Sequence, residues 1–187
     1  LYLYLRAIRR GTTPFAAGVA LALAAMTRPE GVMVYGAVTL HYVIVLWLRP
    51  GPARGRLVYV GSWLVSFGVV YVPYFVWRYT YYGYLLPNTF YVKVGELGLA
   101  AFRRGLLYLR DALLLINPQA VLCLILGLFW RGRRVTQALL YGLLSIYLGY
   151  LLTIGGDQQA FFGPRFIIPL LPFIYMLGIG GAMGLAA

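Results

Sequence analysis

The sequence predicts an all-α protein: a polytopic transmembrane helical bundle with an amphipathic interfacial helix on its outer face. Of its 187 residues, 62% are hydrophobic and 11% are charged, whereas a soluble globular domain is about 45–50% apolar and about 25% charged. Long apolar runs are bounded by arginines, as in membrane proteins with several spans. This composition excludes a lone soluble domain, a disordered chain, a coiled coil, a collagen and a disulfide-stapled scaffold.

Six apolar runs define the expected order of elements. Five have the roughly 17–25 residues that a spanning helix needs, whereas the first is too short to cross alone. Leu1–Leu5 precedes them and is typical of the end of a membrane helix, so we expect residues 1–187 to be a partial transmembrane domain of a longer protein. The runs are Phe15–Met26, Gly31–Leu48, Leu57–Trp77, Ala112–Trp130, Val135–Ile154 and Phe166–Ala187.

The fourth run, Ala112–Trp130, is interrupted by Asn117-Pro118-Gln119. Proline has no backbone N–H and clashes with the preceding helical turn, so it is tolerated at the first position of a helix and disfavoured in the interior. We therefore expect either a helix that begins at Pro118 or a broken helix.

The stretch before this run, Val94–Asp111, has the pattern of an amphipathic helix. At 100° per residue, its charged side chains and that of Lys93 fall within an arc of about 140°, and apolar or small side chains occupy the rest. A helix of this kind lies in the membrane interface. We expect it to lie along the outer surface without crossing. The charged residues are Lys93, Glu96, Arg103, Arg104, Arg110 and Asp111.

The basic residues predict the topology. If the runs alternate, one face receives nine arginines and no acid, and the other receives seven basic residues and all four acids. The positive-inside rule places the first face, with Arg49–Arg56 and Arg131–Arg134, in the cytoplasm. We expect a multi-pass cell-membrane protein whose active face is periplasmic or extracellular. The net charge of +12 is typical here of juxtamembrane anchors, so the bilayer is the expected partner and nucleic acid is not.

Two outer connections combine charges with helix breakers. Thr27–Gly31 reads Thr-Arg-Pro-Glu-Gly. It is either an ordinary turn with a solvated Arg28–Glu30 pair or, because charges at membrane depth usually face a cavity, the lining of one. Gly155–Phe166 carries Asp157 and Arg165. Their carboxylate and guanidinium could hold a sugar hydroxyl and a phosphate, and the alternative is a short loop with an anchoring arginine.

Other distinctive residues are interpreted as structural. His41 is alone in an apolar run, and no second His, Cys or paired carboxylate shares that run, so we expect a core or interface histidine and no metal ligand. Gly180–Gly184 contains a GxxxG spacing, which favours close helix packing. The sequence shows no Walker loop and no GxGxxG motif.

Three stretches carry a family resemblance. They read MTRPEG over Met26–Gly31, YYGYLLPNTFYVK over Tyr81–Lys93, and Gly155-Gly156-Asp157 followed by Arg165-Phe166 and Pro169. In this order they resemble bacterial GT-C-fold membrane glycosyltransferases, which are related to the family 39 protein mannosyltransferase-like enzymes and to the terminal arabinofuranosyltransferase of mycobacteria. The resemblance runs from about Gly18 to Pro172, and the order and spacing of the stretches make it specific.

The resemblance implies an inverting transfer of a sugar from a polyprenyl-phosphate donor to a glycan, lipid or protein acceptor on the extracytoplasmic face. It implies no cofactor besides the lipid-linked donor and leaves a divalent metal open. The catalytic Asp of such enzymes lies in the first outer loop, which we expect upstream of this chain. None of the four acids therefore inherits the catalytic role.

The resemblance and the outer-face charges together predict a substrate-binding set. We expect Arg28 and Arg165 to hold the lipid phosphate, Asp157 to hold a sugar hydroxyl, and Glu30 to orient Arg28 as an ion pair. All members except Arg78 are expected to line one outer cavity, since isolated charges at helix ends are tolerated best in a shared wet space. The set is Arg28, Glu30, Arg78, Asn88, Lys93, Asp157 and Arg165.

Two other functions fit parts of the pattern. A transporter or flippase of a lipid-linked saccharide would show a broken helix, as at Pro118, and a short run such as Phe15–Met26. Against it, the ionisable residues cluster at the outer mouth and are not found within the runs. A non-catalytic membrane scaffold would lack the catalytic acid in the first outer loop.

Overall fold

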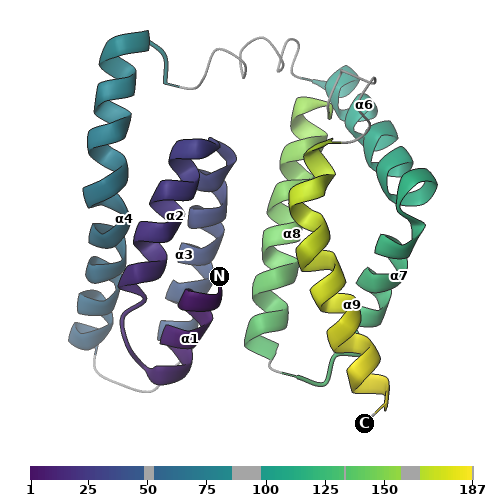
Figure 1. Ribbon diagram of the computed structural model, residues 1–187, viewed down its shortest axis with the longest axis horizontal. Coiled ribbons are helices and arrows are strands. Elements are labelled where there is room, and N and C mark those ends of the chain that lie inside the picture. Colours follow the sequence, from purple (N-terminus) through teal and green to yellow (C-terminus); the bar gives the residue numbers. More distant parts are fainter. Residues whose placement is uncertain (49–52, 86–97, 133, 157–164, 187) are drawn as a thin grey trace. The chain divides into compact units, whose positions relative to one another are not determined.

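The computed structural model describes residues 1–48, 53–85, 98–132, 134–156 and 165–186, and every element in these ranges is helical. The chain divides into two compact units, Leu1–Pro87 and Asn88–Ala187 (Figure 1). Four helical stretches are long and apolar enough to cross a membrane: Glu30–Leu48, Arg54–Tyr82, Arg134–Ile154 and Arg165–Ala186. The predicted all-α class is confirmed, and four of the five predicted spans are helices of sufficient length.

The first unit is built around a buried tryptophan. Trp63 is fully buried, and its indole Nε1 donates a hydrogen bond to Thr39 Oγ1 at 2.8 Å. The rings of Tyr4, Tyr35 and Tyr42 lie around it, with centroids 5.1–5.9 Å from the indole. Aromatic packing of this kind contributes beyond the area it buries. The helices are α1 (Tyr2–Arg10), α2 (Phe15–Thr27), α3 (Glu30–Leu48) and α4 (Ala53–Tyr82).

His41 lies beside this core and is half-buried. The Tyr4 hydroxyl lies 2.6 Å from His41 Nδ1, and the two rings meet edge to face. The contact joins α1 to the middle of α3. Of the two predicted roles, core or interface histidine, the structure shows the interface one.

The short helix α2 is held by close contact with its neighbours. Its 13 residues span about 20 Å, less than the roughly 30 Å of a bilayer's hydrocarbon core, as the sequence predicted. Gly18 of α2 lies against Ser66 of α4, and a Cβ at Gly18 would overlap the Ser66 hydroxyl. The absence of a side chain at Gly18 therefore sets how near α2 and α4 approach.

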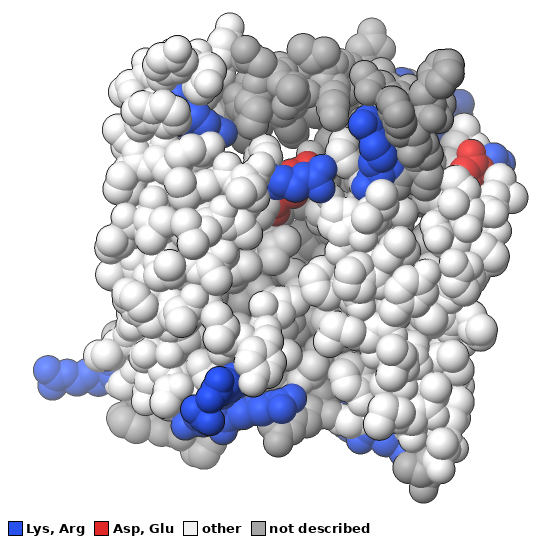
Figure 2. All heavy atoms as spheres, viewed as in Figure 1, with Lys and Arg blue, Asp and Glu red and all other residues white. Residues whose placement is uncertain are grey.

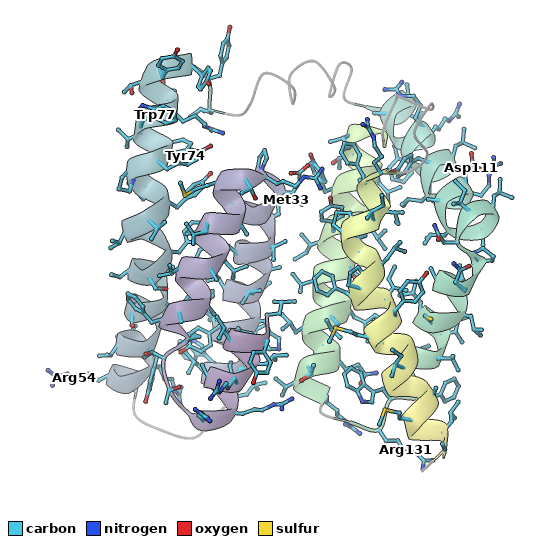
Figure 3. All side chains as sticks on the ribbon, in the orientation of Figure 1. Met33, Arg54, Tyr74, Trp77, Asp111 and Arg131 are labelled. Atoms are coloured by element: carbon cyan, nitrogen blue, oxygen red, sulfur yellow. The ribbon has the colours of Figure 1, made fainter. Side chains whose placement is uncertain are left out.

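The first unit has two distinct ends. At one end, the Arg56 guanidinium lies 5.5 Å from the centroid of the Trp47 ring, and Tyr59 Oη donates to the Gly11 carbonyl at 3.4 Å. At the other, Tyr74 Oη donates to the Met26 carbonyl at 3.3 Å. Figure 3 shows Arg54 at the first end and Met33, Tyr74 and Trp77 toward the other. The alternation assumed for the predicted topology therefore holds within this unit.

The second unit is built on tight helix pairs. Gly181 of α9 lies against α7, where a Cβ would overlap the Leu126 carbonyl, and Gly178 lies against Cys123. Gly180 and Gly184 contact Trp130 and Phe129, so the predicted packing role of the GxxxG spacing is confirmed. The elements are α6 (Leu99–Arg110), the π-helix η1 (Asp111–Ile116), α7 (Pro118–Gly127), α8 (Arg134–Ile154), the 3-10 helix η3 (Arg165–Leu170) and α9 (Leu171–Ala186).

The interruption expected within Ala112–Trp130 is present. Leu99–Ile116 and Pro118–Gly127 meet at a bend of 94°. Asn117 adopts φ −131° and ψ 60°, and its backbone N–H bonds to the Ala112 carbonyl at 3.1 Å, five residues back. The residue before a proline is disfavoured in helical geometry, which is why the helix breaks here. The alternative expectation, a helix beginning at Pro118, is confirmed.

The amphipathic helix differs from its predicted bounds. It begins at Leu99, continues past Asp111 as η1, and lies beside α8 through Ala101 and Gly105; residues 94–97 lie outside the described residues. Part of the face expected to meet lipid is thus packed on protein. Leu99, Phe102 and Leu106 remain 43–69% exposed. The orientation of α6 along the membrane surface stays a prediction.

In the four helical stretches long and apolar enough to cross a membrane, the charged residues lie at or near the ends. Figure 2 shows broad uncharged surface between groups of charged side chains. This distribution suits helices whose middle portions meet lipid, because charges are costly within the hydrocarbon region.

The contact between α7 and α9 can be tested at Gly181. Changing Gly181→Ala places a methyl group on the Leu126 carbonyl and should lower the free energy of unfolding by about 1–3 kcal/mol. The matched control is Gly142→Ala on α8, where a Cβ would meet nothing within 4 Å, and it should be neutral or stabilising. Thermal and denaturant unfolding in detergent measure both, and equal stability of the two variants would contradict the packing.

The topology can be tested with single cysteines in a Cys123→Ser background. We expect a membrane-impermeant maleimide added from outside to label Tyr82→Cys, and to label Arg54→Cys and Arg131→Cys only after permeabilisation. The three positions are exposed, so a lack of labelling is not explained by burial. Outside labelling of the two arginine positions would invert the predicted orientation.

Candidate functional site

In the first unit, the predicted site residues lie at the turn between α2 and α3. Arg28 ends α2 in extended geometry, with φ −141° and ψ 127°, and its carbonyl accepts from Gly31 N at 2.9 Å. A Cβ at Gly31 would lie 2.6 Å from Ala25 Cα, so glycine is needed at this position for α3 to pack so closely against the end of α2. The turn leaves Arg28 exposed and Glu30 half-buried.

The expected ion pair between Arg28 and Glu30 is not formed. Both residues are described, and no contact within ion-pair distance joins them; the pair that does form is Arg110–Asp111, at 2.7 Å. Within the described ranges, Glu30 Oε2 is instead buried without a hydrogen-bond partner. A buried carboxylate oxygen is stabilised when a donor reaches it. Glu30 is therefore placed to accept from water or from a ligand hydroxyl.

Arg78 lies on the last turn of α4, at the same end of the unit. It is one helical turn beyond Tyr74, whose hydroxyl reaches the α2–α3 turn at Met26. Its guanidinium lies 5.4 Å from the Phe75 ring centroid, and Nη2 donates to the Leu85 carbonyl. Arg78 Nε is buried and has no hydrogen-bond partner among the described residues. Arg78 thus holds the chain after α4 and retains a shielded donor.

In the second unit, the end of α8 is built by two glycines. Gly155 and Gly156 have φ of +81° and +76°, and both backbone N–H groups bond to the Leu151 carbonyl at 3.1 Å. Left-handed geometry at a helix end favours glycine. A Cβ at Gly156 would overlap the Tyr108 ring of α6. The two glycines are therefore explained by the fold as well as by the motif.

Tyr108 joins this turn to the start of η3. Its hydroxyl accepts a hydrogen bond from Phe166 N at 3.0 Å. Arg165, the residue before Phe166, is half-buried at the first position of η3. The contact fixes the backbone of Arg165 beside α6 and the end of α8.

The structure brings together part of the predicted set. One end of the first unit carries Arg28, Glu30 and Arg78. In the second unit, Arg165 lies at the start of η3, beside α6 and the end of α8. Asn88, Lys93 and Asp157 lie outside the described residues. The convergence of the six residues other than Arg78 on one cavity stays a prediction.

Sequence reasoning missed Tyr74 and Tyr108, two tyrosines whose hydroxyls tie the site-bearing segments to their neighbours. The signal for Tyr108 was present, because Ala101, Gly105 and Tyr108 recur at helical spacing on one side of α6. That side was interpreted as lipid-facing.

No residue set for a metal is found in the described ranges, where no group of three or more His, Cys, Asp or Glu comes together. Comparison with protein-family models, curated proteins and solved structures gives no match. A functional assignment therefore depends on the residues of this chain and on the resemblance carried by its three motif stretches.

Proposed function

We propose that this protein is a membrane glycosyltransferase that moves a sugar from a polyprenyl-phosphate donor to a glycan, lipid or protein acceptor on the extracytoplasmic face, with inversion. The observation that carries the proposal is the order of its three motif stretches between apolar helices. Each stretch lies at the end of a candidate span or between two of them. The GT-C fold and the enzymatic activity are part of the proposal.

The proposed chemistry suits the charges at these helix ends. When the sugar leaves its donor, negative charge develops on the departing phosphate, and preorganised cations stabilise it. Arg28 and Arg165 are the proposed phosphate ligands, because a guanidinium can donate two parallel hydrogen bonds to phosphate oxygens. Lys93 and Asp157 are proposed to bind the donor and its sugar. The catalytic base is not assigned to any residue of this chain.

Two shielded polar atoms support a polar ligand at the end of the first unit. Glu30 Oε2 and Arg78 Nε are both buried without a hydrogen-bond partner in the part of the chain that the structure describes. Glu30 Oε2 accepts hydrogen bonds and Arg78 Nε donates them. The two atoms therefore match the hydroxyl donors and the phosphate acceptors of a sugar phosphate. Asn88, outside the described residues, is proposed as a further substrate ligand.

A transporter of a lipid-linked saccharide is the second candidate. The 94° bend at Asn117 favours it, since discontinuous helices line the binding sites of many transporters. The two functions differ in product: an enzyme leaves the sugar covalently joined to an acceptor, whereas a transporter leaves the donor intact.

The proposal predicts the effect of Arg165→Ala on sugar transfer. Loss of a charge-assisted contact costs about 1.5–3 kcal/mol, so transfer by the native protein from a radiolabelled polyprenyl-phosphate sugar should fall roughly ten- to a hundredfold. The control is Arg134→Ala, an exposed arginine at the opposite end of α8, which should leave turnover nearly unchanged. Equal losses in the two variants, or no transfer by the unaltered protein, would contradict the proposal.

A further inference from the structure

One arginine of α6 is directed toward the turn that ends α8. A Cβ at Gly155 would lie 3.3 Å from Arg104 Nε and 3.1 Å from the Ala101 carbonyl. Because Gly155 has no side chain, the Arg104 side chain can lie across the turn. The guanidinium of Arg104 is thereby placed at the end of α8, immediately after which Asp157 follows in the sequence.

The neighbouring arginine is directed elsewhere. α6 meets α8 through Ala101 and Gly105, and a Cβ at Gly105 would lie 2.8 Å from Leu152 Cα. At 100° per residue, Arg103 lies about 180° from the middle of this contact, and Arg104 lies about 80° from it. Two adjacent, exposed arginines thus have the same charge and different surroundings.

Tyr108 links the side of α6 that carries Arg104 to the start of η3. Tyr108 is one turn after Arg104 on the same side of α6, and its hydroxyl accepts from the backbone N–H of Phe166 at 3.0 Å. Arg165 directly precedes Phe166 in η3. The segments that carry the two arginines are therefore joined through Tyr108, whose ring lies against Gly156 of the glycine turn.

We propose that Arg104 is a further ligand of the lipid phosphate already assigned to Arg165, with Tyr108 as the positioning residue. Each guanidinium has five N–H donors, so Arg165 can bind phosphate in addition to the contacts it makes within the protein. Asp111, the one acid of the second unit in the described ranges, is paired with Arg110 at 2.7 Å, so its charge is already compensated.

The surroundings favour a lipid phosphate over a free anion. The side chains of Leu99, Phe102 and Leu106 on α6 are exposed, and at 100° per residue Arg104 lies on the opposite side of the helix from them. A helix with one apolar face and an arginine-bearing polar face lies at headgroup depth. The inference rests on the proposed function in one respect only: that function makes the lipid a polyprenyl phosphate.

The test is binding of radiolabelled polyprenyl phosphate to the purified protein in dodecyl maltoside, a detergent without phosphate. Arg104→Gln should weaken binding roughly tenfold or more. Arg103→Gln removes the same charge and should change binding less than about twofold. Nonspecific attraction depends on charge alone, so it would fall equally in the two variants. Arg104→Lys, which keeps the charge and loses the planar fork, should give an intermediate loss. The Lys variant also serves as the test if the Gln variant does not fold.

Equal weakening by Arg103→Gln and Arg104→Gln would overturn the proposal. So would competition by inorganic phosphate with the affinity of the lipid, which would assign the site to a free anion. If binding follows Arg104 and no sugar is transferred, the phosphate site stands and the proposed enzyme fails. If transfer proceeds and neither binding nor transfer changes in Arg104→Gln, the enzyme stands and this inference fails.

Discussion

Close approach of helices at residues without side chains is the interaction on which both units depend. Lipid tails are as apolar as leucine, so helices in a membrane gain little from burying apolar surface and rely on tight packing. Gly18 permits it between α2 and α4, Gly105 between α6 and α8, and Gly181 between α7 and α9. At each contact an added methyl group would meet backbone atoms or a hydroxyl. The helix pairs are thus set by where the chain has glycine.

The same contacts position the candidate site. Gly31 lets α3 return against α2, which holds Arg28 and Glu30 at the turn. Gly105 sets α6 beside α8, and Gly156 leaves room for the Tyr108 ring. Gly31 and Gly156 of the motif stretches therefore have a packing role. Beside Gly31, Arg28 is exposed, and Glu30 Oε2 has no hydrogen-bond partner among the described residues.

Helix positions followed from the sequence because their causes are local. Run length and composition predicted five spans, of which four are helices of sufficient length, and the chemistry of Pro118 predicted the break at Asn117. The sequence did not predict that α6 packs on α8, because small residues such as Ala101 and Gly105 are compatible with contact to lipid or to a neighbouring helix. The prediction of an Arg28–Glu30 ion pair was wrong for a related reason. A spacing of two residues permits a contact between the side chains, but the backbone geometry of the tight turn decides whether the contact forms. Charge patterns located the candidate site residues, whereas tertiary contacts such as that of Tyr108 required the structure.

Tight packing of α6 on α8 at Gly105 holds Arg104 and Tyr108 beside the turn that ends α8. The most direct measurement compares the free energy of unfolding in detergent of Gly105→Ala, where a Cβ would lie 2.8 Å from Leu152 Cα, with that of Gly149→Ala on α8, where a Cβ would meet nothing within 4 Å. Gly105→Ala should be less stable than the unaltered protein by about 1–3 kcal/mol, and Gly149→Ala should be neutral or stabilising. Equal stability of the two variants would contradict a fold that depends on close helix approach at glycine.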